Sequence, residues 1–327
     1  MPGKEINQPA GNDGKDFIDL MIDDIIESDH TVFKDRDVLS PGYMPPAPSH
    51  RELQMKQLLD YFKPCFRNES PANLLVYGKT GTGKTLVTRL IAKKVLKRCQ
   101  AQEITEPFIV YVNVQFTHTK FKVLVKICSD LGLDIPKMGL STDHLINLLK
   151  NTLKEQGRAL IVIIDEIDLM VRSKDKDDLL YLLTRLSENE PAIKISIVGI
   201  SNDLRFKTFL GIRVLSSLNS KEIVFPPYQS AELETILLNR ATLAFKDGMI
   251  DDNIIKAIAA IAAREHGDAR KAIALLRSVG EVADQEQATF VDGHHILKAR
   301  DKLEFDTIKN FIGTLPDNYK IILIAIS

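Results

Sequence analysis

One short segment constrains the fold of this chain more than any other. Residues 78–85 read Gly-Lys-Thr-Gly-Thr-Gly-Lys-Thr and match the phosphate-loop pattern GxxxxGK(S/T). The strand-like run Asn73–Tyr77 precedes this segment directly, and the helix-like run Leu86–Leu96 follows it. A strand, a glycine-rich loop and a helix in this order are the context in which a phosphate loop works. The sequence therefore predicts an α/β fold with a phosphate-binding site at the end of a strand.

The chemistry of phosphate binding explains the residues of this loop. Glycines allow consecutive backbone N–H groups to turn inward around phosphate oxygens, and the following helix adds the positive end of its dipole. Lys84 supplies a point charge for the β and γ phosphates, and the hydroxyl of Thr85 is a ligand for Mg²⁺. The residues expected to bind a nucleotide here are Gly78, Lys79, Thr80, Gly81, Thr82, Gly83, Lys84, Thr85 and Leu86.

Short apolar runs alternate with amphipathic stretches up to about residue 228, which is typical of a parallel sheet covered by helices. After Pro226 and Pro227 the strand pattern stops, and the amphipathic stretches that remain predict an all-helical domain. The expected strands are Leu74–Tyr77, Phe108–Val112, Leu160–Ile164, Ile195–Gly199 and Glu222–Phe225. The expected helices of the second domain are Ala231–Phe245, Asp252–Glu265, Ala269–Ala283 and Asp292–Lys302.

The connection between the second and third strands is longer than a crossover requires. A plain crossover needs one helix, whereas the 46 residues of Asn113–Arg158 contain two helix-like runs, Lys120–Leu131 and Thr142–Gln156. This stretch therefore predicts an extra helical element. Four of its lysines fit contact with phosphates and a solvated helix face equally well; they are Lys120, Lys122, Lys126 and Lys137.

The two ends of the chain differ from its body. Residues 1–30 hold eight acids and two lysines, a net charge of −6, and their composition predicts a disordered acidic tail. The whole chain has a formal net charge of −1, so the remainder carries +5, and near-neutrality does not exclude a nucleic-acid partner. The apolar stretch Tyr319–Ser327 has nothing after it to cover it, which predicts that the chain stops inside a third domain.

Composition excludes several classes of protein. No stretch approaches the roughly 18–20 apolar residues of a membrane helix, and the N-terminus lacks the basic-then-apolar pattern of a signal peptide. Cys65, Cys99 and Cys128 lie far apart, which argues against a disulfide framework or a zinc knuckle and fits a reducing interior. We therefore expect a cytoplasmic protein with no membrane partner.

A buried strand that ends in acids supplies the partner of the phosphate loop. The run Ala159–Ile164 is followed by Asp165 and Glu166 at the carboxyl edge of the predicted sheet, where ligands of such sheets bind. Asp165 is expected to hold the Mg²⁺ shell through water, and Glu166 to orient and polarise the attacking water. A solvated strand end is the alternative for an isolated Asp-Glu pair, but the upstream phosphate loop favours catalysis.

Three further residues are candidates for sensing the γ phosphate or stabilising its charge. Asn202 follows the strand Ile195–Gly199 at the same sheet edge, although a turn asparagine is the alternative. Arg270 begins a helix of the second domain, from which its guanidinium can fold back onto the nucleotide. Arg213 lies in an expected loop before the last strand and is either an arginine finger that acts in trans or a surface arginine.

Further motifs resemble those of one family. The phosphate loop and the Asp165–Glu166 pair occur with several spaced segments that are similar to those of archaeal replication initiators. These initiators are AAA+ ATPases related to the origin recognition complex and the cell-division-control proteins. The similar segments are Asp37–Pro45, His50–Glu52, Tyr111–Asn113, Gly199–Asn202, Arg213–Leu218, Phe225–Tyr228 and Gly267–Ile273, within a resemblance that covers about residues 30–327.

The resemblance implies a fold and a set of roles. The fold is an AAA+ α/β base (31–228), an all-helical lid (229–302) and the truncated start of a winged-helix domain (303–327), preceded by the acidic tail (1–30). Asn202 is then sensor 1, Arg270 is sensor 2, and the extra helical element contacts duplex DNA. The segment with Val38, Leu39, Tyr43 and Pro45 contacts adenine, and Tyr228 and Arg240 join the nucleotide-binding residues.

The resemblance also implies a function. We expect an initiator of DNA replication that binds ATP or ADP with Mg²⁺, hydrolyses ATP slowly, binds origin DNA and helps to recruit or load the replicative helicase, with other initiator copies as further partners. The alternative is an AAA+-type ATPase that remodels another protein, such as a transposition regulator or a signalling NTPase. A third class, a nucleotide-locked binding module, is disfavoured because it has no use for Glu166.

Overall fold

The computed structural model of the chain describes residues 31–117, 119–136, 140–171 and 177–326. The predictions for the acidic tail 1–30 and for Lys137 lie outside these ranges. Among the helices of the described residues, none combines the length with the apolar character that crossing a membrane requires.

The base is built on a parallel sheet whose strands, within the described residues, run in the order β2-β3-β4-β1-β5. All five expected strands are present: β2 and β3 extend one residue and β4 two residues beyond their expected ends, and β5 begins and ends one residue earlier than expected. Because every pair is parallel, all the carboxyl ends meet at one edge. The strands are β1 (Leu74–Tyr77), β2 (Phe108–Asn113), β3 (Leu160–Asp165), β4 (Ile195–Ser201) and β5 (Lys221–Val224).

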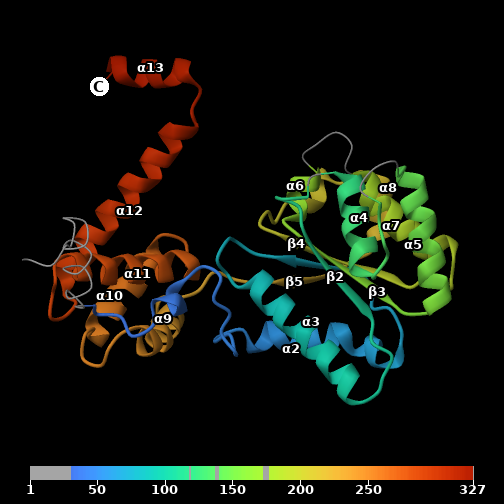
Figure 1. Cartoon of the computed structure of the whole chain (residues 1–327), viewed down its shortest axis with the longest axis horizontal. Helices are drawn as coiled ribbons and strands as arrows, with labels where there is room; N and C mark the ends of the chain where they lie inside the picture. The colour runs from blue at the N-terminus through green and yellow to red at the C-terminus, as the bar shows by residue number, and fades with distance from the viewer. Residues whose placement is uncertain (1–30, 118, 137–139, 172–176, 327) are drawn as a thin grey trace, which may run out of the picture.

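Each face of the sheet packs against its own set of helices. Successive side chains of a strand point to opposite faces, so Leu75 and Tyr77 of β1 enter one core while Leu74 and Val76 enter the other. Helices α2 and α3 cover one face, and α4, α5, α7 and α8 cover the opposite one (Figure 1). The α-helices of the base are α2 (Glu52–Phe62), α3 (Lys84–Ala101), α4 (Lys120–Asp130), α5 (Thr142–Gln156), α6 (Ile167–Val171), α7 (Asp177–Asn189) and α8 (Ile212–Leu218).

The extra element between β2 and β3 consists of α4 and α5, as the length of the connection predicted. Val123 and Ile127 of α4 are buried against β2 and α5, so its lysines lie on the other side. Lys122 and Lys126 are exposed, and Lys126 forms an ion pair of 2.5 Å with Asp130. These lysines therefore lie on a solvent-exposed face of α4, which an anionic partner can reach.

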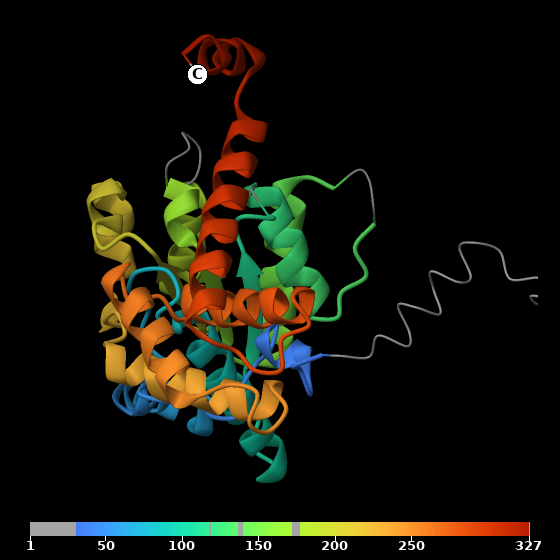
Figure 2. The ribbon, with the colours of Figure 1, turned by 90° about the vertical axis from the view of Figure 1, so that its left-hand side faces the viewer.

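The lid is all-helical, and its last helix is longer than expected. Its fourth helix was expected to end at Lys302 but continues to Thr314, because no helix-breaking residue intervenes before Gly313 and Pro316. The predicted boundary at 302/303 therefore falls inside a continuous helix. Figure 2 shows the second half of this helix rising from the lid, with α13 at its end. The lid helices are α9 (Ser230–Ala244), α10 (Asp252–Arg264), α11 (Ala269–Gln285) and α12 (Gly293–Thr314), followed by α13 (Asp317–Ile326).

The first described segment packs on the lid, whereas the sequence prediction assigned it to the base. Val32, Phe33 and Leu39 are buried in the lid core. The Val32 N–H donates to the Asp284 carboxylate at 2.6 Å, and the Lys34 N–H donates to the Ala244 carbonyl at 2.7 Å. The apolar pattern of this segment shows that it is buried but does not reveal which core receives it.

The Phe33 ring provides a test of this attachment. It stacks 4.9 Å from the Phe245 ring, and a Cβ at Gly280 would lie 2.3 Å from its Cζ, so the ring fills space that only glycine leaves open. We expect Phe33→Ala to lower the free energy of unfolding of the lid by about 3 kcal/mol, as measured by chemical denaturation. Phe290→Ala is the control, since Phe290 is 57% exposed. Equal losses in the two variants would contradict the packing of this segment on the lid.

Candidate functional site

The phosphate loop connects β1 to α3 at the carboxyl edge of the sheet. Helix α3 begins at Lys84, two residues earlier than the apolar pattern indicated. Gly83 precedes it with a φ of +90°, a left-handed conformation that glycine adopts at little cost. The free N–H groups of the first helical turn and of the loop therefore lie together where an anion binds.

Lys84 lies buried within the loop with its ammonium group fully hydrogen-bonded. Its Nζ donates to the carbonyls of Gly78 (2.8 Å) and Lys79 (2.7 Å) and to Oδ1 of Asn202 (2.8 Å). These three acceptors match its three N–H donors. Burial lowers the pKa of Lys84 to about 8. The structure thus brings together two predicted residues, Lys84 and Asn202, that lie more than 100 positions apart.

The two predicted metal ligands also meet. The Thr85 hydroxyl donates to Oδ2 of Asp165 at 2.8 Å. The same oxygen accepts a hydrogen bond of 2.6 Å from the Tyr111 hydroxyl, which reaches it from the neighbouring strand β2. Burial, and then the bond to Asp165, raise the pKa of Tyr111. In the sequence Tyr111 is part of the motif Tyr111–Asn113, and no local signal assigns its hydroxyl to Asp165.

Glu166 occupies an unusual backbone position directly after β3. Its φ is +56°, which costs a residue with a side chain about 1–2 kcal/mol. Burial raises the pKa of the Glu166 carboxyl, and the neighbouring Asp165 and Asp168 raise it further. The positive charges of Arg270 and Lys84 act in the opposite direction. The carboxyl therefore lies among charges of both signs, beside the loop.

Asp168 orients the end of β4 and is a second residue that sequence reasoning missed. It lies on α6, and its Oδ1 accepts hydrogen bonds from the Ser201 hydroxyl (3.0 Å) and from the Asn202 N–H (3.2 Å). The backbone of Asn202 is thereby fixed to the helix that follows Glu166. Its place three residues after Asp165, in the sequence Asp-Glu-Ile-Asp, is the local signal that the sequence offers.

Arg51 connects the loop to the start of the lid. It is 1% exposed, and its Nε and Nη2 donate to the carbonyls of Thr82 (2.9 Å) and Pro226 (2.7 Å). Its guanidinium stacks 3.6 Å from the centroid of the Tyr228 ring. The Tyr228 hydroxyl in turn lies close to Gly83, where a Cβ would be 3.1 Å from it. Tyr228, predicted to bind nucleotide, is thus at the loop, and the buried arginine that holds it was not predicted.

The predicted adenine-contact residues cluster on the lid. Val38 and Leu39 are buried there, and the Val38 carbonyl accepts a hydrogen bond of 3.0 Å from Nη1 of Arg240. The Arg240 guanidinium lies 4.2 Å from the centroid of the Tyr43 ring. Pro45 is half-buried in a proline-rich stretch, residues 41–48. Four of these residues therefore form one group with α9, even though Arg240 is about 200 positions from the others.

The two predicted arginines differ in their placement. Arg270 is the second residue of α11, and its charge affects the pKa of both Lys84 and Glu166, so it faces the site from the lid. Arg213 is exposed on helix α8, where a loop had been expected. Val214 and Leu218 form the buried face of that helix and turn Arg213 outward. Among the described residues, Arg213 has no contact with the phosphate loop.

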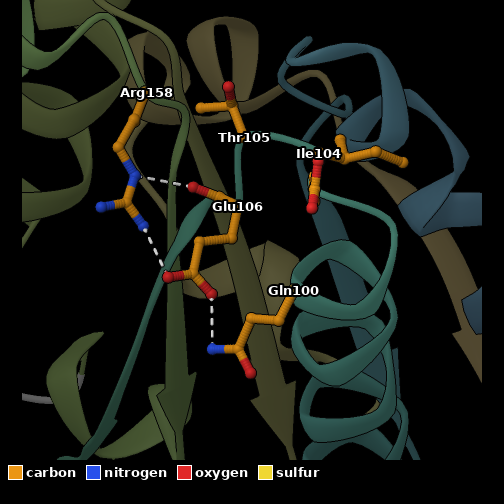
Figure 3. Close-up of a pocket in the computed structure, with 6 residues that line it drawn as sticks. Gln100, Ile104, Thr105, Glu106 and Arg158 are labelled. Carbon is orange, nitrogen blue, oxygen red and sulfur yellow. Dashed lines mark hydrogen bonds and ion pairs between the residues drawn. The ribbon is translucent and has the colours of Figure 1, made fainter.

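A surface hollow elsewhere on the base lacks these features (Figure 3). It lies at the opposite, amino edge of the sheet, between the end of α3 and the starts of β2 and β3. Its polar groups bind one another: Gln100 donates to Glu106 at 2.8 Å, and Nε of Arg158 donates to the Glu106 carbonyl at 2.7 Å. The hollow therefore lacks the phosphate loop and the strand-end carboxylates of the site at the other edge.

Family models match both parts of the chain. A model described as an AAA domain matches residues 67–207, and one described as a Cdc6 AAA+ ATPase-type lid domain matches residues 234–301. The first contains the phosphate loop, Asp165 and Asn202, and the second contains Arg270.

Characterised relatives define the family more closely. The chain is 43% identical over 309 residues to ORC1-type DNA replication protein 1 of Sulfurisphaera tokodaii, covering 94% of this chain and 76% of the relative. The chain belongs to the ORC1/Cdc6 family of AAA+ replication initiators. It is also 42% identical over 299 residues to the ORC1-type DNA replication protein of Thermococcus kodakarensis, covering 90% of this chain and 72% of that one.

Solved structures of the ORC1/Cdc6 family share this fold. The Aeropyrum pernix ORC1 protein in complex with DNA is 38% identical, with a TM-score of 0.79 over 89% of this chain and 75% of that one. Cdc6p from Pyrobaculum aerophilum is 25% identical, with a TM-score of 0.72 over 83% of this chain and 72% of that one. The base and lid described above are therefore those of a replication initiator, and the AAA+ phosphate loop implies nucleotide binding.

The lowered pKa of Lys84 predicts how nucleotide affinity depends on pH. In the free protein the ammonium group loses its proton near pH 8, whereas phosphate oxygens beside it favour the charged form. Affinity for ADP should therefore be at its maximum below pH 8 and should fall by up to about tenfold per pH unit above it. Calorimetric titrations in buffers of different ionisation enthalpy should reveal proton uptake above pH 8. Lys94→Met, at an exposed position of α3, is the control and should keep the wild-type profile.

Proposed function

We propose that this initiator uses the phosphate loop as an ATP-dependent switch and binds origin DNA in a manner set by the nucleotide. The observation that carries the proposal is the convergence of Lys84 and Asn202 from the base with Arg270 from the lid beside Glu166. Residues of the base and of the lid would then contact the same phosphates, so that nucleotide state and lid position would be coupled.

Nucleotide binding would exchange internal hydrogen bonds for bonds to phosphate. Lys84 would leave the carbonyls of Gly78 and Lys79 for the β and γ phosphates. The hydroxyl of Thr85 and the carboxylate of Asp165 fit Mg²⁺, because this ion takes oxygen ligands and shares them with phosphates. When bound there, Mg²⁺ supplies positive charge to the phosphates. The cluster around Val38, Tyr43 and Arg240 would receive the adenine side of the nucleotide.

Slow hydrolysis would depend on Glu166. A carboxylate with a raised pKa is a stronger base than an ordinary glutamate and is suited to orient and polarise the attacking water. Asn202 would contact that water or the γ phosphate, and Arg270 would stabilise the developing charge. The exposed position of Arg213 supports a role toward a second initiator copy, where an arginine can act in trans.

Lid movement would couple the nucleotide to DNA. A ligand shifts a conformational equilibrium only if it contacts the two arrangements differently. ATP would satisfy this condition, since its γ phosphate reaches Arg270 on the lid whereas ADP lacks that group. The angle between base and lid would then differ between the two nucleotide states.

DNA contact is supported by a relative and by two surfaces of this chain. The Aeropyrum pernix ORC1 protein was solved in complex with DNA. Helix α4 presents Lys122 and Lys126 to solvent, which suits contact with phosphates. Residues 303–326 would begin a winged-helix domain, a proposal supported by the exposed apolar side chains of α12 and α13. These include Phe305, Ile308, Phe311, Tyr319 and Ile321. Recruitment or loading of the replicative helicase would follow from origin binding.

The two rival functions are less well supported. Membership of the initiator family argues against a transposition regulator or a signalling NTPase. The raised pKa of Glu166, at a strained backbone position beside the loop, argues against a module that binds nucleotide without hydrolysing it.

Replacement of Glu166 tests the hydrolytic part of the proposal. We expect Glu166→Gln to bind ATP with wild-type affinity and to lower the rate of single-turnover hydrolysis at least about 100-fold. Glu155→Gln, on the exposed side of α5, is the matched control and should hydrolyse ATP normally. Undiminished hydrolysis in Glu166→Gln would mean that another group positions the water.

DNA footprinting tests the initiator function. Protection confined to a repeated origin element would support it, and binding that is absent or independent of sequence would contradict it.

The salt dependence of DNA binding tests the extra element between β2 and β3. Lys122→Ala should reduce the slope of log affinity against log salt concentration by about 1, as expected for one lost phosphate contact. Lys94→Ala on α3 should leave the slope unchanged. An equal slope for the wild-type protein and for both variants would show that Lys122 of α4 does not contact DNA phosphates.

A further inference from the structure

The lid touches the phosphate loop through one turn, between α10 and α11. Asp268, at the end of this turn, is 6% exposed, and its Oδ2 accepts a hydrogen bond of 3.2 Å from the Thr80 hydroxyl. The next residue, Ala269, donates its N–H to the Gly81 carbonyl at 3.2 Å. Two hydrogen bonds, one by a side chain and one by the backbone, therefore join the lid to the middle of the loop.

Gly81 allows this close approach. A Cβ at this position would lie 1.7 Å from Oδ1 and 2.2 Å from Cγ of Asp268. The carboxylate thus lies directly against the backbone of the loop, in space that only a glycine leaves free. Gly81 has a φ of +67°, so a side chain there would also be strained. Gly81 therefore serves the lid contact as well as the loop conformation.

Asp268 carries out a second task with its other oxygen. Its Oδ1 accepts hydrogen bonds from the N–H groups of Arg270 (2.8 Å) and Lys271 (3.2 Å) and so caps α11. One carboxylate therefore fixes both the start of α11 and the position of that start on the loop. Arg270 lies two residues further, within the turn that this cap orders.

The opposite side of the same turn is attached to the connection between base and lid. The Tyr228 N–H donates to the Gly267 carbonyl at 3.1 Å. A Cβ at Gly267 would lie 2.4 Å from the Tyr228 carbonyl, so the two backbones are in direct contact. Tyr228 is itself stacked on the buried Arg51. The turn is thus held at two points, and rotation of the lid away from the loop must break the hydrogen bonds from Thr80 to Asp268 and from Ala269 to Gly81.

We propose that Asp268 is a positioning residue that fastens the lid to the phosphate loop, keeps Arg270 directed at the site and slows the release of bound nucleotide. The inference rests on the proposed nucleotide switch and adds the contact through which the lid is held on the loop. Thr80 is its partner. Loss of either side chain allows the lid to open more often, and nucleotide then leaves faster.

Dissociation of fluorescently labelled ADP, followed by stopped flow, tests the proposal in the full chain. A hydrogen bond to a charged group is worth enough to change the release rate roughly tenfold. We expect this acceleration in Asp268→Ala and in Thr80→Val, with the double variant no faster than the faster single one. Thr80→Ser keeps the hydroxyl that donates to Asp268 and should release ADP more slowly than Thr80→Val does.

A matched variant separates the contact from helix capping. Asp292 caps α12 in the same way, since its Oδ1 accepts from the N–H groups of His294 (2.9 Å) and His295 (3.3 Å). Asp292→Ala therefore loses a cap of the lid without touching the loop, and it should release ADP at the wild-type rate. Acceleration in Asp292→Ala equal to that in Asp268→Ala would overturn the proposal, because general loosening of the lid would then explain both.

Amide hydrogen exchange measures the same contact without nucleotide. Asp268→Ala should accelerate exchange at Ala269 and in residues 80–83, and Asp292→Ala should not. Unchanged exchange there, or slower ADP release in Asp268→Ala, would overturn the proposal, the latter because the carboxylate would then be repelling phosphates. A wild-type protein that binds no nucleotide would instead overturn the proposed function, and the exchange experiment would still decide whether Asp268 holds the lid.

Discussion

The parallel direction of every strand in the sheet is the constraint on which the rest of the structure depends. Because the carboxyl ends all lie at one edge, the segments that follow β1, β3 and β4 must meet there. This brings the phosphate loop, the Asp165–Glu166 pair and Asn202 together, although they are far apart along the chain. Both faces of the sheet are covered by helices, so the edge is the part of the sheet that remains available to a ligand.

At that edge, the groups suited to bind phosphate and metal are hydrogen-bonded to the protein itself. The ammonium of Lys84 binds two carbonyls and an amide, and the hydroxyl of Thr85 binds Asp165. A buried charge without partners would be costly, and these bonds remove most of that cost in the nucleotide-free protein. Nucleotide binding then exchanges one set of hydrogen bonds for another. The pKa of Lys84, lowered to about 8 by burial, shows how incomplete the compensation is.

The base and the lid have separate hydrophobic cores, and few side chains connect them near the site. Arg51 and Tyr228 join the loop to the start of the lid, and Asp268 joins the loop to α11. The N-terminal segment belongs to the lid core through Phe33 and Leu39, so three of the predicted adenine-contact residues, Val38, Leu39 and Tyr43, pack with the lid. Two cores joined at a few polar contacts can change their relative angle without repacking either interior, which is the property that a nucleotide switch needs.

The strands, the phosphate loop, the acidic end of β3 and the helical nature of the lid could be predicted from the sequence, because they follow from periodicity and from motifs within a few residues. Membership of one family also followed from such motifs. Tertiary structure alone decided which distant partners meet: Tyr111 with Asp165, Asp168 with the backbone of Asn202, Arg51 with Thr82, and Asp268 with Thr80. It also placed residues 32–39 in the lid core and turned Arg213 outward on a helix. A local pattern shows that a side chain is buried or polar, but its partner is chosen by which segments the fold brings into contact.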